Sequence, residues 1–223
     1  MKQYIKLLGD VMTKGYDDVL TNPLIGEVRQ VIAPQLRFDL AKGFPLLTTR
    51  PQDFEKLRDE ALNIMHASNA QDVVRGITTT QEDRTFNVPV TDGMPVRCEI
   101  INEGHEIHCI LSLDSVDVVS GLPRVIALYA IVVRLLSRES VGRYDGTLVL
   151  NIGRAFVRHK DFKLVNTQIN RKPLKMCKLQ FNPERSSYKD SVPDDLTIVD
   201  YIYHDEIDEL TGLALNKTDG VKS

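Results

Sequence analysis

The sequence predicts a single α+β domain, in which strands and a few helices are mixed along the chain without regular βαβ alternation. Two observations support this prediction. A chain of 223 residues with 42% hydrophobic content can bury a substantial core within one domain. Apolar positions with the period of a helix and runs with the composition of strands also follow one another in irregular order. We therefore expect one domain over residues 1–223.

The first part of the chain should form a helix, two strands and a second helix. The opening segment has its apolar residues on one helical face and then meets Gly15, which favours a helix end. That face consists of Tyr4, Ile5, Leu7, Leu8, Val11 and Met12. Turn residues then separate two expected strands, over 27–33 and 35–40. Apolar residues at steps of three and four predict a helix over 53–66, with Glu60 at the edge of its apolar stripe.

The remainder should contain a hairpin, a buried helix and shorter elements. A β-hairpin is predicted where the runs 95–101 and 106–113 flank Asn102-Glu103-Gly104. The segment 124–138 is apolar on nearly every face, as expected of a helix in the centre of a domain, and Pro123 suits its first turn. The other expected elements are polar strands within 75–90, a strand over 147–152, a helix over 160–170, a strand over 174–181 and a flexible tail over 211–223.

Charge and cysteine content exclude several classes of protein. A formal charge of -3 and an isoelectric point near 6.0 do not indicate a sequence-blind nucleic-acid binder or a polybasic membrane-surface protein. The longest apolar run, 125–133, is too short to cross a bilayer, and the start lacks the form of a signal peptide, so we expect a cytoplasmic protein. The three cysteines, Cys98, Cys109 and Cys177, cannot all pair and lack metal-ligand spacing. We expect reduced thiols and no metal.

One long motif resembles a known enzyme family. The segment QLRFDLAKGFPLLTTR (35–50) resembles the part of thymidylate synthases in which an Arg-Phe strand leads into GFPLLTTK. The other similar blocks, at corresponding spacings, are MKQYIKLLGDVMTKG (1–15), DSVDVVSGLPRVIALYAIVV (114–133), QINRKPLKMCKLQF (168–181) and DYIYHDEID (200–208). The resemblance implies a mixed sheet packed with a buried central helix, and a homodimer that pairs sheet against sheet. Relatives that hydroxymethylate dCMP or dUMP share this fold.

The resemblance also implies a chemistry, which is the transfer of a one-carbon unit from methylenetetrahydrofolate to C5 of a pyrimidine deoxynucleotide monophosphate. A cysteine thiolate must add to C6, a glutamate assists through ordered water, and arginines hold the phosphate. Glu60 stands at the position of the family's catalytic glutamate. The alternative interpretation of Glu60 is an ordinary solvated carboxylate at the edge of a helix. Ser115 and Asp117 match substrate-contacting residues of the family's S-C-D-V, and Arg75 is the counterpart of an arginine donated across the dimer interface.

The nucleophile of the family has no matching cysteine. Relatives carry it in a Pro-Cys-His motif, and counting back from Gly104 places Gly93 at that position. Cys98 is the nearest thiol, but its use would shorten the following strand and no His follows it. We therefore expect Cys98 to be a buried, inert cysteine, and Cys109 to belong to the core.

Other residues of the family pocket also differ. The phosphate-binding arginine is replaced by Asp114, which repels a phosphate, and the ring-reading asparagine by Val125, which forms no hydrogen bond. Phe156 and Arg158 stand where relatives hold the ribose hydroxyl. The chain has no Trp, its middle is shorter than usual, and 211–223 does not resemble the closing tail over the folate. These differences argue against methylenetetrahydrofolate as a cofactor and against ordinary thymidylate synthesis.

Three hypotheses remain open. The first is a family-derived protein that binds a nucleotide-like anion through arginines that the family does not have at these positions, Arg124, Arg154 and Arg158. The alternative interpretation of each arginine is a solvated surface residue or a member of a surface ion pair. The second is a non-catalytic dimeric scaffold or regulatory partner that kept the framework. The third is an active methyl- or hydroxymethyltransferase in which Cys98 or another group serves as nucleophile. We rank the first above the second because Glu60 and Asp117 persist.

Overall fold

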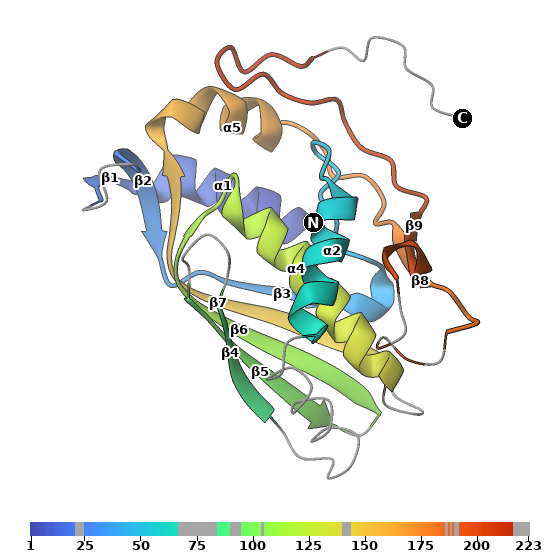
Figure 1. Cartoon of the computed structure of the whole chain (residues 1–223). Coiled ribbons are helices and arrows are strands. Elements are labelled where there is room, and N and C mark those ends of the chain that lie inside the picture. Colours follow the sequence, from blue (N-terminus) through green and yellow to red (C-terminus); the bar gives the residue numbers. More distant parts are fainter. Residues whose placement is uncertain are drawn as a thin grey trace.

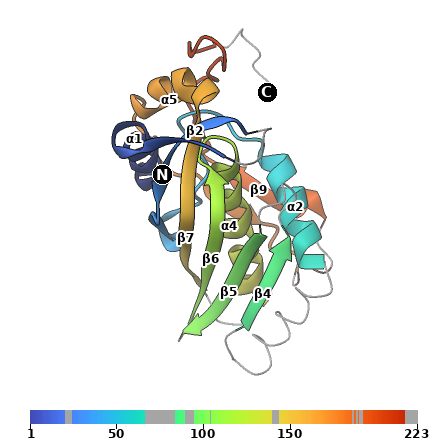
Figure 2. The same cartoon turned by 90° about the vertical axis from the view of Figure 1, so that its left-hand side faces the viewer.

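The computed structural model describes residues 1–20, 25–66, 84–89, 95–103, 105–139, 144–185, 187, 189 and 192–215, with the main chain alone at 84–89 and 95–96. Seven of its strands form one mixed sheet in the order β1-β2-β7-β6-β5-β4, with β3 also paired to β7 (Figures 1 and 2). The strands are β1 (Tyr16–Val19), β2 (Glu27–Ile32), β3 (Gln35–Asp39), β4 (Arg84–Pro89), β5 (Pro95–Glu103), β6 (Glu106–Asp117) and β7 (Tyr144–Arg158). A separate pair is formed by β8 (Lys178–Phe181) and β9 (Leu196–Val199).

Helices cover one face of the sheet, as Figure 1 shows. They are α1 (Lys2–Lys14), α2 (Phe54–His66), α4 (Gly121–Glu139) and α5 (Phe162–Ile169), with short 3-10 turns η1 (Leu40–Lys42), η2 (His159–Asp161) and η4 (Pro193–Asp195). Almost every side chain of α4 is buried, because this helix lies between the sheet and α2. The crossover through α4 joins the parallel pair β6 and β7, which requires a connection of this length.

In both β6 and β7 the alternation of buried and exposed residues is interrupted, and the two interruptions lie at the same level of the sheet. In β6 the buried side chains alternate up to Leu113, and the next one is Val116, three residues later. In β7 Leu148, Leu150 and Ile152 are buried at alternate positions, with Val149 buried between the first two, and the next buried residue is Ala155. The register pairs Leu113 with Ile152 and Val116 with Ala155, so the two irregularities lie side by side. The alternation of buried residues is therefore interrupted at this level in both strands.

Most sequence predictions for the elements are confirmed. The first helix ends before Gly15, the second spans Phe54–His66, and Pro123 lies in the first turn of α4. The hairpin forms, with Glu103 opposite Glu106. Of the predicted polar strands within 75–90, β4 is described and the rest lies outside the described residues.

Other predictions need correction. The strand expected over 147–152 is more than twice as long, because β7 is central and pairs with β6 on one side and with β2 and β3 on the other. Only the last four residues of the strand expected over 174–181 form β8, and before them Cys177 forms only an isolated bridge with Phe44. Two short strands, β1 and β9, were not predicted.

The segment expected to be a flexible tail begins with an ordered turn. Gly212 N donates to the Asp208 carbonyl at 2.8 Å, and Ile207 forms a bridge with Ala214. The Thr167 hydroxyl of α5 donates to the Gly212 carbonyl. Gly212 has φ 73° and lies so close to the Lys163 backbone that a Cβ would collide with it, so a glycine is required here. Residues 216–223 lie outside the described residues.

The threonines of GFPLLTTR bond the motif to the distant segment 168–174. Thr48 and Thr49 are fully buried. Leu174 N donates to the Thr48 hydroxyl at 3.0 Å, and the Gln168 amide donates to the Thr49 hydroxyl at 3.0 Å. Arg171 donates to the Thr49 carbonyl at 2.7 Å. Because buried polar groups need such partners, the motif and the QINR block that resembles the family fix each other in place.

The rest of the motif makes similar bonds. Arg50 donates to the carbonyl of Val119, just before α4. The Tyr201 hydroxyl, from the DYIYHDEID block, donates to the Leu47 carbonyl at 2.7 Å. The family-like blocks therefore form one hydrogen-bonded framework, and their presence is explained by folding without reference to catalysis.

The sheet face away from the helices is largely polar where it is described. Arg97, Ser112, Asp114 and Asn151 are all exposed on β5, β6 and β7. These residues therefore do not by themselves require a partner sheet to cover them. A sheet-to-sheet homodimer remains a prediction of the resemblance.

Candidate functional site

Glu60 is bound by an arginine of the central helix. Arg124 Nη2 lies 2.9 Å from Glu60 Oε1, and Arg124 Nε lies 3.0 Å from Glu60 Oε2. This is a bidentate pair between α2 and α4, and the two side chains are only 20% and 17% exposed. Both carboxylate oxygens therefore accept hydrogen bonds from a permanent cation.

Asp117 has a structural role at the start of α4. Its Oδ1 accepts from Val119 N at 2.8 Å and from Ser120 N at 3.2 Å, and the side chain is buried. These bonds shape the turn that leads into the helix. Its other oxygen, Oδ2, lies 3.0 Å from Arg158 Nε. Little acceptor capacity is left for a substrate.

Arg158 is matched by two carboxylates. Besides Asp117, its Nε lies 2.9 Å from Asp161 Oδ2. Burial raises the pKa of Asp161 above its ordinary value, and the positive charge of Arg158 opposes this shift. Asp161 was not among the predicted residues, although its i,i+3 spacing from Arg158 is a signal available in the sequence.

The cysteines do not provide a nucleophile. Cys98 is fully buried, with its Sγ 3.5 Å from Cys109 Sγ. Burial raises the pKa of the Cys98 thiol well above its ordinary value, and the neighbouring Cys109 adds to the effect. Burial also raises the pKa of Cys177 to about 11. Catalytic thiolates need a lowered pKa and access to substrate, and none of these buried thiols combines the two.

Other predicted residues have separate positions. Ser115 and Arg154 are paired directly across β6 and β7. Val125 is fully buried in α4 and Phe156 nearly so in β7, so neither presents a polar group. Arg75 lies outside the described residues, as does position 93.

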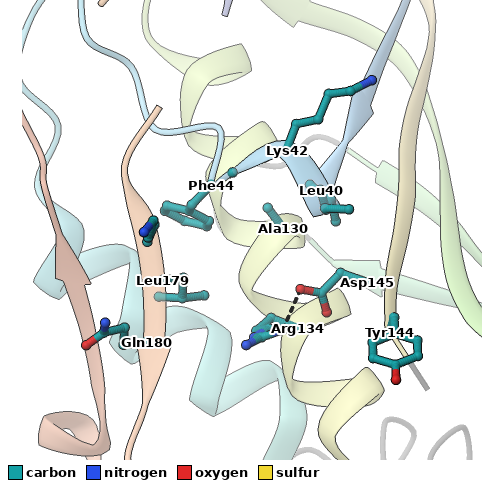
Figure 3. A pocket seen from close by; sticks show the side chains of 12 residues that line it. Leu40, Lys42, Phe44, Ala130, Arg134, Tyr144, Asp145, Leu179 and Gln180 are labelled. Carbon is teal, nitrogen blue, oxygen red and sulfur yellow. Dashed lines mark hydrogen bonds and ion pairs between the residues drawn. The ribbon is translucent and has the colours of Figure 1, made fainter. Parts of the chain in front are cut away.

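A cavity of about 370 Å³ lies apart from all of these residues. Figure 3 shows Leu40, Phe44 and Ala130 around it, with the Arg134–Asp145 ion pair at one side and the Lys42 amino group turned away. Arg134 Nη1 lies 2.8 Å from Asp145 Oδ2. None of the predicted site residues lines this cavity, and sequence reasoning did not find it, because its walls come from four segments far apart in the chain.

The described residues contain neither a metal-binding cluster nor a membrane-spanning helix. No cluster of three or more His, Cys, Asp or Glu in that part of the chain is arranged to hold a metal ion. None of the described helices has the length and apolar character needed to span a bilayer.

A mixed sheet over a buried central helix, with family-like blocks bonded into one framework, defines a protein of the thymidylate synthase fold class. The sequence model of the family described as thymidylate synthase matches residues 2–82 and 84–211. This chain belongs to the thymidylate synthase family.

Proposed function

We propose that this member of the thymidylate synthase family binds a pyrimidine deoxynucleotide monophosphate, or a similar nucleotide-like anion, without cysteine-dependent transfer to C5. The observation that carries the proposal is that the residues needed for transfer to C5 are buried or already bound by other groups of the chain. Every cysteine of the chain is buried, and Glu60 and Asp117 are both held in ion pairs. The membership of the family, whose enzymes act in nucleotide metabolism, supports the ligand class.

Methylenetetrahydrofolate is the cofactor that the family implies, and the described residues do not fit its chemistry. Its one-carbon transfer needs a thiolate to activate the pyrimidine and a carboxylate able to relay protons. The Cys98 thiol is buried with a raised pKa, and both Glu60 oxygens accept from Arg124. We derive no step through this cofactor.

Thermal unfolding in the presence of dUMP, dCMP or dTMP tests the proposal. A ligand that binds only the folded chain at about one hundred times its Kd stabilises by about 2.7 kcal/mol, which raises Tm by roughly 5 °C or more for a domain of this size. We expect such a rise with at least one of these nucleotides, and none with deoxyuridine, which lacks the phosphate. An unchanged Tm with all three nucleotides at millimolar concentration would overturn the proposal.

A second candidate function is a non-catalytic dimeric scaffold or regulatory partner. The framework bonds of Thr48, Thr49 and Arg171 favour it, because they account for the family-like blocks without any ligand. The same thermal experiment separates the two candidates, since a scaffold gives no nucleotide-dependent rise in Tm.

A further inference from the structure

The cavity beside α4 has mainly apolar walls. Figure 3 shows Leu40, Phe44 and Leu179 around a common space, with Ala130 of α4 beside them. The volume of this space is about 370 Å³. Packed protein interiors leave few voids larger than a water molecule, whereas sites for small molecules begin at about 300 Å³. The cavity therefore has the size and the walls to take the apolar part of a small molecule.

The walls are held in place by contacts within the chain. Phe44 N donates to the Cys177 carbonyl at 2.9 Å, which ties the end of η1 to the segment just before β8. The Phe44 ring also packs edge-on against Phe54, with 6.1 Å between the ring centroids. On the other side, the ion pair of Arg134 with Asp145 joins α4 to the start of β7. Because these contacts form without a ligand, binding requires little ordering of the walls.

Arg134 presents an unused pair of donors at this cavity. Its Nη1 donates to Asp145 Oδ2 at 2.8 Å, whereas its Nε and Nη2 have no hydrogen bond or ion pair within the described part of the chain. Another arginine of α4, Arg124, uses the same Nε and Nη2 edge to bind both oxygens of Glu60. The Arg134 side chain is 45% exposed, so a solute can reach it. Its unused edge has the geometry to bind a carboxylate through two parallel hydrogen bonds.

The other charges of the lining also favour an anion. The charged residues that line the cavity are Asp145 and three cations, Lys42, Arg134 and Lys178. Asp145 offers a ligand little acceptor capacity, because its Oδ1 is buried and its Oδ2 is bound by Arg134. Lys42 is paired with Asp39 at 2.7 Å, and its amino group is turned away from the cavity (Figure 3). Lys178 is exposed and has no ion-pair partner among the described residues, so the lining keeps a positive charge.

We propose that this cavity binds a small molecule that consists of an apolar ring or short chain and one carboxylate. The apolar part lies between Leu40, Phe44 and Leu179, and the carboxylate accepts hydrogen bonds from Nε and Nη2 of Arg134. None of the site residues predicted from the sequence lines this cavity, so the inference is independent of nucleotide binding.

Calorimetric titration with 3-phenylpropionate and its neutral counterpart of the same shape, 3-phenylpropionamide, tests the proposal on the wild-type chain. We expect a Kd of about 1 mM or tighter for the carboxylate, which is the affinity expected of a ligand of this size. The amide should bind at least about tenfold more weakly, because it cannot form charge-assisted bonds with the arginine. Acetate, which lacks the apolar part, should not bind measurably.

Two variants locate the binding. Arg134→Lys retains the charge that faces Asp145 but removes the paired donors, so we expect it to raise the Kd for 3-phenylpropionate about fivefold or more. Ala130→Leu places a larger side chain in the cavity and should abolish binding. Arg37→Lys is the matched control, since Arg37 is an exposed arginine of β3 that does not line this cavity, and it should leave the Kd unchanged. Circular dichroism checks that each variant is folded.

The outcomes separate this inference from the proposed function. Equal affinity for the carboxylate and the amide in the wild type overturns the inference, and this comparison needs no variant. Binding of 3-phenylpropionate that a folded Ala130→Leu variant retains unchanged overturns it as well. A wild-type chain that binds dUMP but not 3-phenylpropionate overturns this inference alone. A chain that binds 3-phenylpropionate but no nucleotide supports this inference and overturns the proposed function.

Discussion

Replacing Asp117 with alanine is expected to lower the free energy of unfolding by about 3 kcal/mol, the larger of the two stability effects that we predict. The alanine removes the acceptor for Val119 N and Ser120 N and also one of the two carboxylates that bind Arg158. Both backbone donors lie at the start of α4, the helix on which the core is built. Chemical denaturation monitored by circular dichroism measures the change.

Asp117→Asn is the control that separates the loss of the two backbone hydrogen bonds from the loss of the ion pair with Arg158. The asparagine carbonyl accepts the same two backbone hydrogen bonds, so we expect a loss of only about 1 kcal/mol from the ion pair. If alanine and asparagine were equally tolerated, and both abolished nucleotide binding, Asp117 would be a ligand-contacting residue and its structural role would be refuted.

Replacing Arg124 with methionine is expected to cost about 2 kcal/mol of stability. Glu60 would then be a charged group, only 20% exposed, without its partner. Removing one partner of a fully buried pair costs about 3–5 kcal/mol, and the partial exposure of this pair reduces that cost. Urea unfolding of the wild type and the variant under identical buffer conditions provides the comparison.

The double variant Glu60→Met with Arg124→Met should recover most of that loss, to within about 1 kcal/mol of the wild type. Apolar side chains of similar size remove both charges, and no unpaired ion is left between α2 and α4. An additive loss in the double variant would show that the two residues do not interact, contrary to the bidentate geometry.

The sequence predicted the elements whose signals are local. The apolar stripe of the first helix, the Asn-Glu-Gly hairpin and the all-apolar segment of the central helix each depend on a short stretch of residues. The length of β7 was underestimated because it depends on neighbours on both of its edges, which no local pattern contains. β1 is short and exposed along its whole length, so it has no alternation of apolar residues to detect.

The candidate site was predicted only in part, because its interactions are long-range. Glu60 and Arg124 were each singled out, one as a catalytic carboxylate and the other as an anion-binding residue. Their mutual pairing spans 64 positions and required the packing of α2 on α4. The burial of Cys98 was expected from its place on a strand, whereas its contact with Cys109 depends on the register of β5 and β6.

The central claim is that the chain has no cysteine able to add to a pyrimidine. The most direct measurement is the intact mass of the denatured protein after incubation with 5-fluoro-dUMP and methylenetetrahydrofolate. A thiolate that adds to C6 of this nucleotide becomes trapped after C5 is alkylated, since fluorine cannot leave as a proton does. We predict an unchanged mass. A covalent adduct mapped to Cys98 would contradict the account.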